Sequence, residues 1–551
     1  MKRLEGVVYH SAQEAKRWLD CDAWLPLTAG EALRDAAQRV PAKIALVDDE
    51  TRLSFAQFDE ESERLGAALL KAGLDPGDRV IFQMATASET AVAVFACMKA
   101  GLIPVCALPQ HRDLEIGFLA GLTRARGYIV QADMGSFDLA GFARTMRKAH
   151  SAIEILVIAR GPAGPGDLSM KQLIDAQDLA EARALLAEIT IAPTDVAMLQ
   201  LSGGTTGVPK VIPRFHGEYL GYAAAWANFF GLTEEDVGLW ALPLIHNAAM
   251  IYYLLPSVLQ ARTLVLMGRF EARRFFETIE REGVTATGSI GPIAAHILDY
   301  KDIGQHDLSR LRLFHTLARA DAMEAHTGIG MMLVFGITEG VLTGAPLDAS
   351  VAVRHTTAGR PVSPFDEFRL LHPGTEDAVP PGASGELCFR GPSTLRGYYR
   401  NPEANATAFT SDGFFRTGDL MRAHDLDGGP WYSFEGRIKD NIDRGGEKFG
   451  TEDIEALLAR HPALADARVV AMPDRVYGEK ACAYLVLRPG AACPTLAEIG
   501  AFLLGHGLAK FKLPERLEQI ESLPVTRVGK VDKAALRALI AAKIAAEETG
   551  S

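Results

Sequence analysis

The chain reads Leu201-Ser202-Gly203-Gly204-Thr205-Thr206-Gly207-Val208-Pro209-Lys210 between two apolar runs, at 196–201 and 211–213. Glycine loses more backbone entropy on ordering than other residues, and serine and threonine hydroxyls compete for nearby main-chain hydrogen bonds. We therefore predict a strand, a loop and a second strand here. The loop is rich in amide, hydroxyl and ammonium donors, which are the groups that bind phosphate oxygens.

The spacing of this loop excludes one class of nucleotide-binding protein. A P-loop has a glycine, four further residues and then Gly-Lys-Ser/Thr. Here Gly204, Gly207 and Lys210 follow one another at three-residue steps, and Val211 offers no hydroxyl to a metal. An ordinary surface turn is the alternative interpretation. The motifs further along the chain favour phosphate binding.

The length and composition indicate a large globular protein with more than one domain. The chain has 551 residues, whereas a single core stops growing at ~250–300 residues. Hydrophobic residues make up 48% of the chain and charged residues 23%, which are globular values. The net charge of −12 makes a general nucleic-acid or anionic-membrane surface unexpected, so an anionic ligand must be held by local donors.

Cysteine usage and hydrophobicity predict a cytoplasmic protein. The first residues lack the apolar core of a signal peptide. The longest mostly apolar run, at 248–259, has 12 residues, against the ~20 needed to span a bilayer. None of the six cysteines forms a C-x-x-C pair, so we expect neither a zinc site nor a disulfide framework. The cysteines are Cys21, Cys97, Cys106, Cys388, Cys482 and Cys493.

Alternating strand and helix patterns predict an α/β fold. Strand-like runs at 80–84, 103–109 and 153–158 alternate with helical apolar spacing at 58–72 and 88–100. Such alternation implies a parallel sheet with crossover helices. We predict parallel α/β subdomains over the first three fifths of the chain.

The pattern changes in the last two fifths of the chain. Runs at 368–371 and 385–390 indicate a smaller, turn-rich β region, and helix and strand patterns restart after a glycine-rich segment at 436–450. We predict a large N-terminal domain at 1–438 and a small α+β C-terminal domain at 439–551, with the hinge near Lys439.

Five motifs in a fixed order resemble those of the adenylate-forming superfamily, which comprises acyl-CoA synthetases, peptide-synthetase adenylation domains and luciferases. The glycine-rich loop is the first motif. The others are Phe335-Gly336-Ile337-Thr338-Glu339, Thr417-Gly418-Asp419, Gly436-Arg437-Ile438-Lys439-Asp440 and Gly529-Lys530. The resemblance covers nearly the whole chain. Each motif is weak alone, and the ordered set is specific.

Three further stretches are similar to the aryl-acid branch of that superfamily. They are the segment 104–112, the pair His246-Asn247 and the segment 441–448. That branch contains 2,3-dihydroxybenzoate–AMP and salicylate–AMP ligases. The implied cofactors are ATP, Mg²⁺ and either coenzyme A or the phosphopantetheine of a carrier protein.

The implied reaction is attack of a substrate carboxylate on the α-phosphate of ATP, with release of pyrophosphate. The nucleophile is already an anion near neutral pH, so no general base is needed. The difficulty is to bring two anions together and to stabilise the phosphoryl charge, so positioning and cations should dominate.

The resemblance implies roles for residues around the nucleotide. Lys530 is the key cation and Glu339 holds Mg²⁺, unless Glu339 and Thr338 simply begin a helix. Asp419 and Arg437 bind the ribose, unless they form an ordinary ion pair. The residues predicted around the phosphates are Ser202, Gly203, Gly204, Thr205, Thr206, Gly207 and Lys210. Phe335 is predicted against adenine, and Gly336 and Thr338 belong to the same motif.

The acid pocket is where the chain departs from its apparent relatives. The resemblance implies His246 beside the carboxylate and Asn247 at a ring 2-hydroxyl. Tyr252 stands where a serine is expected near a ring 3-hydroxyl, and the stretch under the ring reads Leu317-Ala318-Arg319-Ala320. Val334 and Leu342 are further candidates for the pocket wall. These departures favour a salicylate-like, benzoate-like or saturated cyclic acid over 2,3-dihydroxybenzoate, with Arg319 expected in solvent.

The second half-reaction is predicted to form a thioester. The resemblance implies that a mobile C-terminal domain alternates about Lys439, and that Lys439 and Lys448 then face the site. The main prediction is an acid–CoA ligase, and the alternative is an aryl-acid–AMP ligase loading a separate carrier protein. A non-catalytic nucleotide-binding protein is disfavoured by Lys530, Glu339 and Asp419. The segment around Lys530 also resembles one that lysine acetyltransferases modify.

Overall fold

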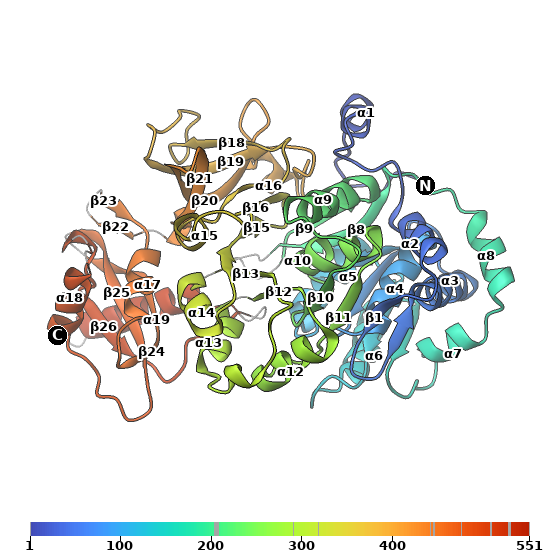
Figure 1. Cartoon of the computed structure of the whole chain (residues 1–551), viewed down its shortest axis with the longest axis horizontal. Coiled ribbons are helices and arrows are strands. Elements are labelled where there is room, and N and C mark those ends of the chain that lie inside the picture. The colour runs from blue at the N-terminus through green and yellow to red at the C-terminus, as the bar shows by residue number, and fades with distance from the viewer. Residues whose placement is uncertain are drawn as a thin grey trace. The chain divides into compact units, whose positions relative to one another are not determined.

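The computed structural model describes residues 2–202, 209–289, 291–317, 319–440, 442–444, 447–474, 477–506, 508, 510–526 and 530–549 (Figure 1). The chain forms two compact units. Unit 1 comprises Met1–Glu367, Phe389–Phe415 and Asp425–Trp431, and unit 2 comprises Phe368–Cys388, Arg416–His424 and Tyr432–Ser551.

The first large sheet of unit 1 has seven strands in the order β7-β6-β5-β3-β4-β8-β9. All neighbouring pairs are parallel except β8–β9. Its core contains Ile81, Tyr128 and Leu199, which are fully buried. The strands are β3 (Arg79–Gln83), β4 (Ile103–Val105), β5 (Gly127–Gln131), β6 (Ile155–Ala159), β7 (Leu168–Ser169), β8 (Val196–Leu201) and β9 (Val211–Phe215).

The second large sheet also has seven strands, in the order β14-β13-β12-β10-β11-β1-β2. Only its edge pair β1–β2 is antiparallel. Leu239, Phe275 and Phe314 lie in its core. The strands are β1 (Ile44–Val47), β2 (Arg52–Ser54), β10 (Val237–Trp240), β11 (Thr263–Leu266), β12 (Ala286–Ser289), β13 (Leu313–Thr316) and β14 (Met331–Leu333).

The helices of unit 1 cross between these strands, as parallel pairing requires. Thr28 and Glu31 form a capping box at the start of α2, and α2, α3 and α4 pack against one another (Figure 1). The helices are α1 (Ala12–Asp20), α2 (Ala29–Arg39), α3 (Phe55–Lys71), α4 (Ser88–Lys99), α5 (Asp113–Thr123), α6 (Leu139–Ala149), α7 (Met170–Asp175), α8 (Leu179–Ala187), α9 (His216–Phe229), α10 (Asn247–Ala249), α11 (Leu255–Leu259), α12 (Ala272–Glu282), α13 (Gly291–Asp299), α14 (Ala320–Thr327), α15 (Val351–Thr356) and α16 (Pro402–Thr407), with the π-helical turn η1 (Met250–Leu254) and the 3-10 turn η2 (Ile303–Gln305).

Two small sheets follow the parallel ones. The antiparallel sheet β15-β16-β17 consists of β15 (Phe335–Ile337), β16 (Val341–Gly344) and β17 (Arg360–Pro361). The other is the predicted turn-rich β region, with four strands in chain order: β18 (Glu367–Leu371), β19 (Ser384–Arg390), β20 (Phe415–Leu426) and β21 (Gly429–Arg437).

The C-terminal part of unit 2 has its own sheet and core. The sheet has the order β23-β22-β25-β24, and β26 also pairs with β25. Leu536 and Ile540 of the terminal helix pack on Val470, as an amphipathic helix should. The elements are η3 (Ile438–Asp440), β22 (Ile442–Arg444), β23 (Glu447–Phe449), α17 (Glu452–Leu458), β24 (Leu464–Asp474), β25 (Gly478–Leu487), α18 (Leu496–Gly505), η4 (Lys510–Lys512), β26 (Arg516–Gln519) and α19 (Lys533–Thr549).

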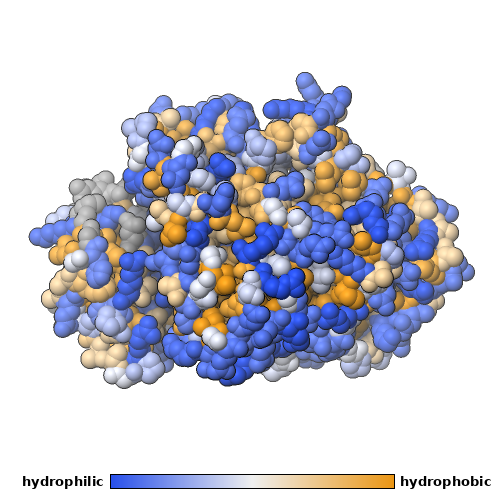
Figure 2. Space-filling view, in the orientation of Figure 1, coloured by the Kyte–Doolittle hydropathy of each residue, from blue (hydrophilic) through white to orange (hydrophobic). Residues whose placement is uncertain are grey.

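The predicted fold class is confirmed: the parallel sheets, the small β region and the restarted α+β pattern are all present. Across the described residues, no helix combines the length and the apolar character that crossing a membrane requires. On the face shown in Figure 2, hydrophilic residues predominate and hydrophobic ones occur in small groups.

Candidate active site

The two ends of the predicted phosphate loop are held together by strands β8 and β9. Leu201 lies opposite Val211, and the amide of Ser202 donates to the carbonyl of Lys210 at 2.9 Å. The predicted strands on both sides of the loop are therefore confirmed. The predicted phosphate contacts of Gly203, Gly204, Thr205, Thr206 and Gly207 lie outside the described residues and stay predictions.

Glu339 lies in the tight turn between β15 and β16. The carbonyl of Glu339 accepts from the amide of Leu395 at 2.8 Å. Gly340 has φ +121°, and a Cβ there would lie 1.8 Å from the carbonyl oxygen of Ser393, so only glycine fits this turn. The alternative interpretation, that Thr338 and Glu339 begin a helix, is wrong because the chain forms a hairpin here.

Tyr398 connects this turn to the phosphate loop. Its hydroxyl donates to Oε1 of Glu339 at 2.9 Å, and the ammonium of Lys210 lies 4.5 Å from the centroid of its ring. Burial raises the pKa of Glu339, and the Tyr398 hydrogen bond and the Lys210 charge oppose that rise. The loop's cation and the predicted magnesium ligand are thus neighbours around one tyrosine.

Sequence reasoning missed Tyr398. It follows Glu339 by 59 positions and is almost completely buried, so its sequence pattern is that of a core aromatic residue. The only signal in the sequence is its place in a turn-rich stretch, Gly397-Tyr398-Tyr399, where a tyrosine pair is unusual.

A buried hydrogen-bond chain orients Asn247. The Gln200 side-chain amide donates to the Tyr219 hydroxyl at 3.2 Å, and that hydroxyl donates to Oδ1 of Asn247 at 2.7 Å. Because Oδ1 already accepts, the NH₂ group is the one left to donate. Asn247 is therefore fixed as a donor, and neither Gln200 nor Tyr219 was found from the sequence.

His246 precedes Asn247 as the N-cap of α10. Its Nδ1 accepts from the amide of Ala248 at 3.2 Å. In the neutral ring the proton is therefore on Nε2, which can donate to an oxyanion. The side chain is exposed, unlike the buried Asn247.

Tyr252 lies on the π-helical turn η1, a kind of turn that often occurs at functional sites. Its ring stacks on Trp226 with centroids 4.1 Å apart and meets His315 edge-on at 5.0 Å. A Cβ at Gly336 would lie 3.0 Å from the Tyr252 hydroxyl and 2.5 Å from Leu342, so the bare glycine leaves room for both. The structure thus places Tyr252, Gly336 and Leu342 together.

The remaining predicted pocket residues lie at the ends of β13 and β14 and in β15. Val334 is buried and its amide donates to Thr316 at 3.0 Å, whereas Phe335 is partly buried. Leu317 is 49% exposed. Arg319 is exposed, as expected, in the left-handed region at φ +61°. Ala318 lies outside the described residues.

Unit 2 carries the remaining predicted residues. Asp419 is buried and pairs with Arg437, whose Nε lies 3.2 Å from Oδ1. This is the ion pair named as the alternative to ribose binding, and it does not prevent Asp419 from accepting further hydrogen bonds. Lys439 lies in η3, and the backbone of Lys448 in β23 lies opposite that of Asp443 in β22.

Lys530 closes a turn in unit 2. Its carbonyl accepts from the amide of Thr526 at 2.6 Å, and its own amide donates to the Thr526 hydroxyl at 3.2 Å. The residue is exposed.

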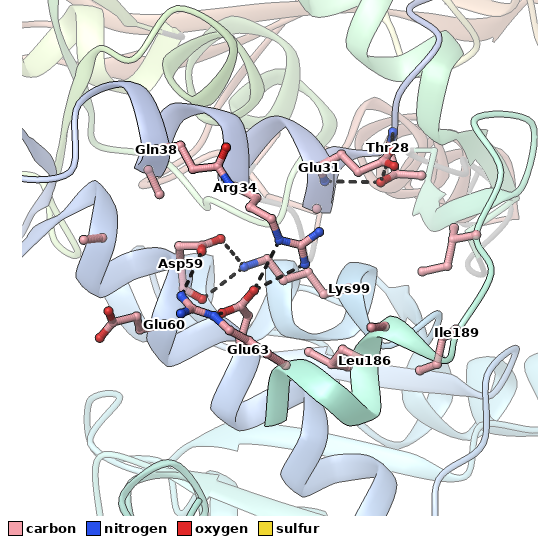
Figure 3. Close-up of a pocket in the computed structure, with 16 residues that line it drawn as sticks. Thr28, Glu31, Arg34, Gln38, Asp59, Glu60, Glu63, Lys99, Leu186 and Ile189 are labelled. Atoms are coloured by element: carbon pink, nitrogen blue, oxygen red, sulfur yellow. Dashed lines mark hydrogen bonds and ion pairs between the residues drawn. The ribbon is translucent and has the colours of Figure 1, made fainter. Parts of the chain in front are cut away.

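A cavity of about 710 Å³ in unit 1 is lined by none of the predicted site residues (Figure 3). It lies among α2, α3 and α8, and its floor carries the buried pair Lys99–Asp59. Glu63 accepts from Arg34 at 3.3 Å and from Arg183 at 2.7 Å. The buried Lys99, Asp59 and Glu63 pair with one another or with half-exposed arginines, so the network is explained as a link between helices.

Comparisons with known proteins identify the family of the chain. The model of the AMP-binding enzyme family matches residues 33–399, and that of the AMP-binding enzyme C-terminal domain matches residues 453–530. The 2,3-dihydroxybenzoate-AMP ligase of Bacillus subtilis is 37% identical over 98% of this chain and 99% of its own. The salicyl-AMP ligase / salicyl-S-ArCP synthetase of Mycobacterium tuberculosis is 37% identical over 97% of this chain and 94% of its own.

A solved structure supports the same assignment. The anthranilate CoA ligase AuaEII in complex with anthranoyl-AMP superposes with a TM-score of 0.83, at 25% identity over 95% of this chain and 98% of that chain. The chain belongs to the AMP-binding enzyme family, in the aryl-acid AMP ligase branch of the adenylate-forming enzymes. It is an ATP-dependent, AMP-forming ligase.

Proposed function

We propose that this enzyme activates a salicylate-like aryl acid as its acyl-adenylate and passes the acyl group to the phosphopantetheine thiol of a separate carrier protein. The observation that carries the acid class is the orientation of Asn247. Its NH₂ group is left to donate, which suits the oxygen of a hydroxyl ortho to the carboxylate.

The environment of Tyr252 argues against a second ring hydroxyl. Its bulk, stacked on Trp226, stands where the resemblance places a serine for a ring 3-hydroxyl. Among the described residues, Tyr252 also meets the ring of His315, and its own hydroxyl lies beside Gly336. A ring 3-hydroxyl would therefore meet the bulk of a tyrosine where the resemblance places a small serine. The acid therefore carries a hydroxyl at one ortho position and none next to it.

The first half-reaction then proceeds by positioning. The acid's carboxylate oxygen forms a bond to the α-phosphorus, the bond from that phosphorus to the β-bridging oxygen breaks, and pyrophosphate leaves. His246 donates from Nε2 to the carboxylate, and Asn247 holds the ring. Lys210 and Lys530 neutralise charge on the phosphates, which is the largest barrier to bringing two anions together.

Glu339 fits the role of a magnesium ligand. A hard cation prefers carboxylate oxygen, and Mg²⁺ is commonly held by only one or two protein carboxylates. Oε1 of Glu339 already accepts from Tyr398, which fixes the carboxylate beside the base of the phosphate loop. Bound Mg²⁺ would neutralise charge on the phosphate oxygens. Asp419 and Arg437 would bind the ribose. The adenine would lie against the segment that contains Phe335, Gly336 and Thr338.

The choice of the thiol that accepts the acyl group rests on the names of the relatives. One loads an aryl carrier protein, abbreviated ArCP in its name, whereas the solved structure belongs to a CoA ligase. These names favour the carrier protein, which reverses the order of the two acceptors expected from the sequence. Coenzyme A remains the second candidate because it presents the same phosphopantetheine thiol. Alternation about Lys439, with Lys448 turned to the thiol, belongs to this proposal.

Regulation at Lys530 belongs to the same proposal. An exposed lysine on a turn is accessible to a lysine acetyltransferase, and acetylation would remove the charge that adenylation needs. Loss of ATP–pyrophosphate exchange on acetylation, restored by a deacetylase, is the expected result.

An acid panel tests the proposed substrate class. ATP–pyrophosphate exchange is measured with salicylate, benzoate, 2,3-dihydroxybenzoate and cyclohexanecarboxylate. Salicylate should give the highest kcat/KM, because only it offers Asn247 an ortho oxygen without a second hydroxyl against Tyr252. Preference for 2,3-dihydroxybenzoate over benzoate and cyclohexanecarboxylate would overturn the proposed pocket.

A further inference from the structure

Arg262 is a buried guanidinium without a counter-ion among the described residues. It precedes β11 and has 0% exposure. Its Nε, Nη1 and Nη2 atoms are buried and make no hydrogen bond within the described chain. A buried charge is normally paired, because an isolated one costs several kcal/mol even after the protein relaxes. Something other than these side chains must therefore offset the charge.

Two more unsatisfied donors lie beside Arg262. Tyr253 and Ser257 are four residues apart, from η1 to α11, and therefore share a helix face. The amide of Arg262 donates to the carbonyl of Ser257 at 2.8 Å, which brings the two residues together. Tyr253 is 2% exposed and Ser257 is 3% exposed. Neither side-chain hydroxyl has a hydrogen-bond partner in the described chain.

The nearby carboxylate is already used. Asp236 exerts a charge effect on Arg262 but does not pair with it. Its Oδ2 lies 2.6 Å from Nη2 of Arg312, and its Oδ1 accepts from Thr285 at 2.6 Å. One carboxylate thus faces two guanidinium groups, which leaves a net positive charge. Burial raises the pKa of Tyr253 well above its ordinary value, so that hydroxyl stays a neutral donor.

We propose that Arg262, Tyr253 and Ser257 form a buried site for a small monovalent inorganic anion, which in the cell is chloride. The guanidinium and both hydroxyls can donate, and an anion accepts from all of them. Gln260 also has an unpaired oxygen, but a neutral amide cannot offset the charge. Near-complete burial excludes a large anion.

The site has a structural consequence for the acid pocket. Tyr253 follows Tyr252 on the same π-helical turn, and Arg262 immediately precedes β11. A bound anion would join the turn that carries Tyr252 to the start of β11. This inference does not depend on which acid or acceptor the enzyme uses.

Thermal unfolding of the full-length protein tests the proposal. Sodium gluconate, too large for the site, is replaced stepwise by sodium chloride at constant ionic strength. The Tm should rise by roughly 3 °C or more as chloride saturates the site. Arg262→Leu should remove this dependence. Arg281→Leu, at an exposed guanidinium, should keep it.

Bromide in place of chloride gives a second readout on the unaltered protein. Crystals soaked in bromide should show an anomalous peak within hydrogen-bond distance of the Arg262 guanidinium. Equal Tm values in gluconate and chloride, together with no such peak, would mean that water satisfies Arg262, and the proposal would be wrong. If Arg262→Leu does not fold, the bromide peak decides alone.

Discussion

The orientation of Asn247 is the residue-scale feature on which the proposed substrate class depends. An asparagine can present either its oxygen or its NH₂ group, and the two ends suit opposite partners. Here the Tyr219 hydroxyl donates to the side-chain oxygen of Asn247, and the side-chain amide of Gln200 donates to that hydroxyl. The proposed preference for an ortho-hydroxy acid would thus depend on Tyr219 and Gln200 as well as on Asn247.

Replacing Tyr219 with Phe tests this chain of hydrogen bonds. Asn247 loses its anchor and can present either end, so kcat/KM for salicylate should fall by about 2- to 13-fold, as one net hydrogen bond predicts. Benzoate, which has no ortho oxygen, should be used as before. The measurement is ATP–pyrophosphate exchange with both acids.

The matched control is Tyr222→Phe on the same helix. The Tyr222 hydroxyl is buried without a hydrogen-bond partner in the described chain, so its removal should leave both acids unaffected. A parallel loss of salicylate and benzoate activity in Tyr219→Phe would show that Tyr219 serves only the packing of α9.

Tyr398 allows a prediction about pH. Glu339 must be an anion to hold a metal, burial raises its pKa, and the Tyr398 hydrogen bond lowers it. Tyr398→Phe removes the lowering contribution, so the folded-state pKa of Glu339 rises further. The acidic limb of kcat/KM for ATP should therefore move to higher pH, measured across a buffer series at saturating acid.

Tyr399→Phe serves as the control for that pH profile. Its hydroxyl is buried and has no hydrogen-bond partner among the described residues, and it does not contact Glu339. The acidic limb of this variant should match the unaltered enzyme. An acidic limb that is unmoved in Tyr398→Phe would contradict the role given to the Tyr398–Glu339 bond.

At the scale of elements, one carboxylate joins α14, β14 and α15 near the acid pocket. Glu324 accepts from the amide of Met331 at 2.7 Å, from Arg354 at 2.7 Å and from His355 at 2.9 Å. Although burial raises the pKa of Glu324, these hydrogen bonds lower it to about 2. The side chain is partly exposed, so solvent screens part of this effect.

Glu324→Gln should therefore lower the Tm at neutral pH by roughly 2–4 °C. A depressed folded-state pKa stabilises the fold above the unfolded pKa, and that contribution is lost as pH falls through the folded value. The Tm difference should be full above about pH 4.5 and shrink as pH falls towards 2. Glu277→Gln, at an exposed position on α12, should show no such difference. If the Tm difference between Glu324→Gln and the unaltered enzyme did not change with pH, the stabilisation would not come from the ionised Glu324 carboxylate.

The elements were largely predictable because their patterns are local. Alternation and helical spacing placed α3, α4 and β3 within a few residues, and the strands on both sides of the phosphate loop were expected from two apolar runs. The sequence alone did not exclude that a helix begins at Glu339, where the structure has a hairpin. A threonine and a glutamate can begin a helix or fill a turn, and the choice depends on Ser393, which is distant in sequence.

The site was predictable in its motifs and not in its supporting contacts. His246, Asn247 and Glu339 lie in recognisable stretches, whereas Tyr219, Gln200 and Tyr398 act through tertiary proximity that no spacing encodes. Leu317 was expected in the stretch under the ring, and about half of its surface is exposed. An apolar residue after a strand gives no sign of which way its side chain turns.

At the scale of the whole molecule, we assign Lys530 to the adenylation half-reaction. Lys530→Ala should reduce ATP–pyrophosphate exchange by about 10²–10³, the loss expected when one charge-stabilising group is removed. Thioester formation from pre-made acyl-adenylate should change far less. Lys533→Ala is the matched control, because that ammonium is 2.8 Å from Glu455 within unit 2. Equal loss of both half-reactions would refute the assignment.

The most direct test of the central claim is intact-mass measurement of the acceptor. The enzyme, ATP, Mg²⁺ and salicylate are mixed with equal concentrations of coenzyme A and a phosphopantetheinylated aryl carrier protein. The account predicts that the carrier protein gains the mass of one salicyl group and that little salicyl-CoA forms. Rapid accumulation of salicyl-CoA with an unmodified carrier protein would contradict it.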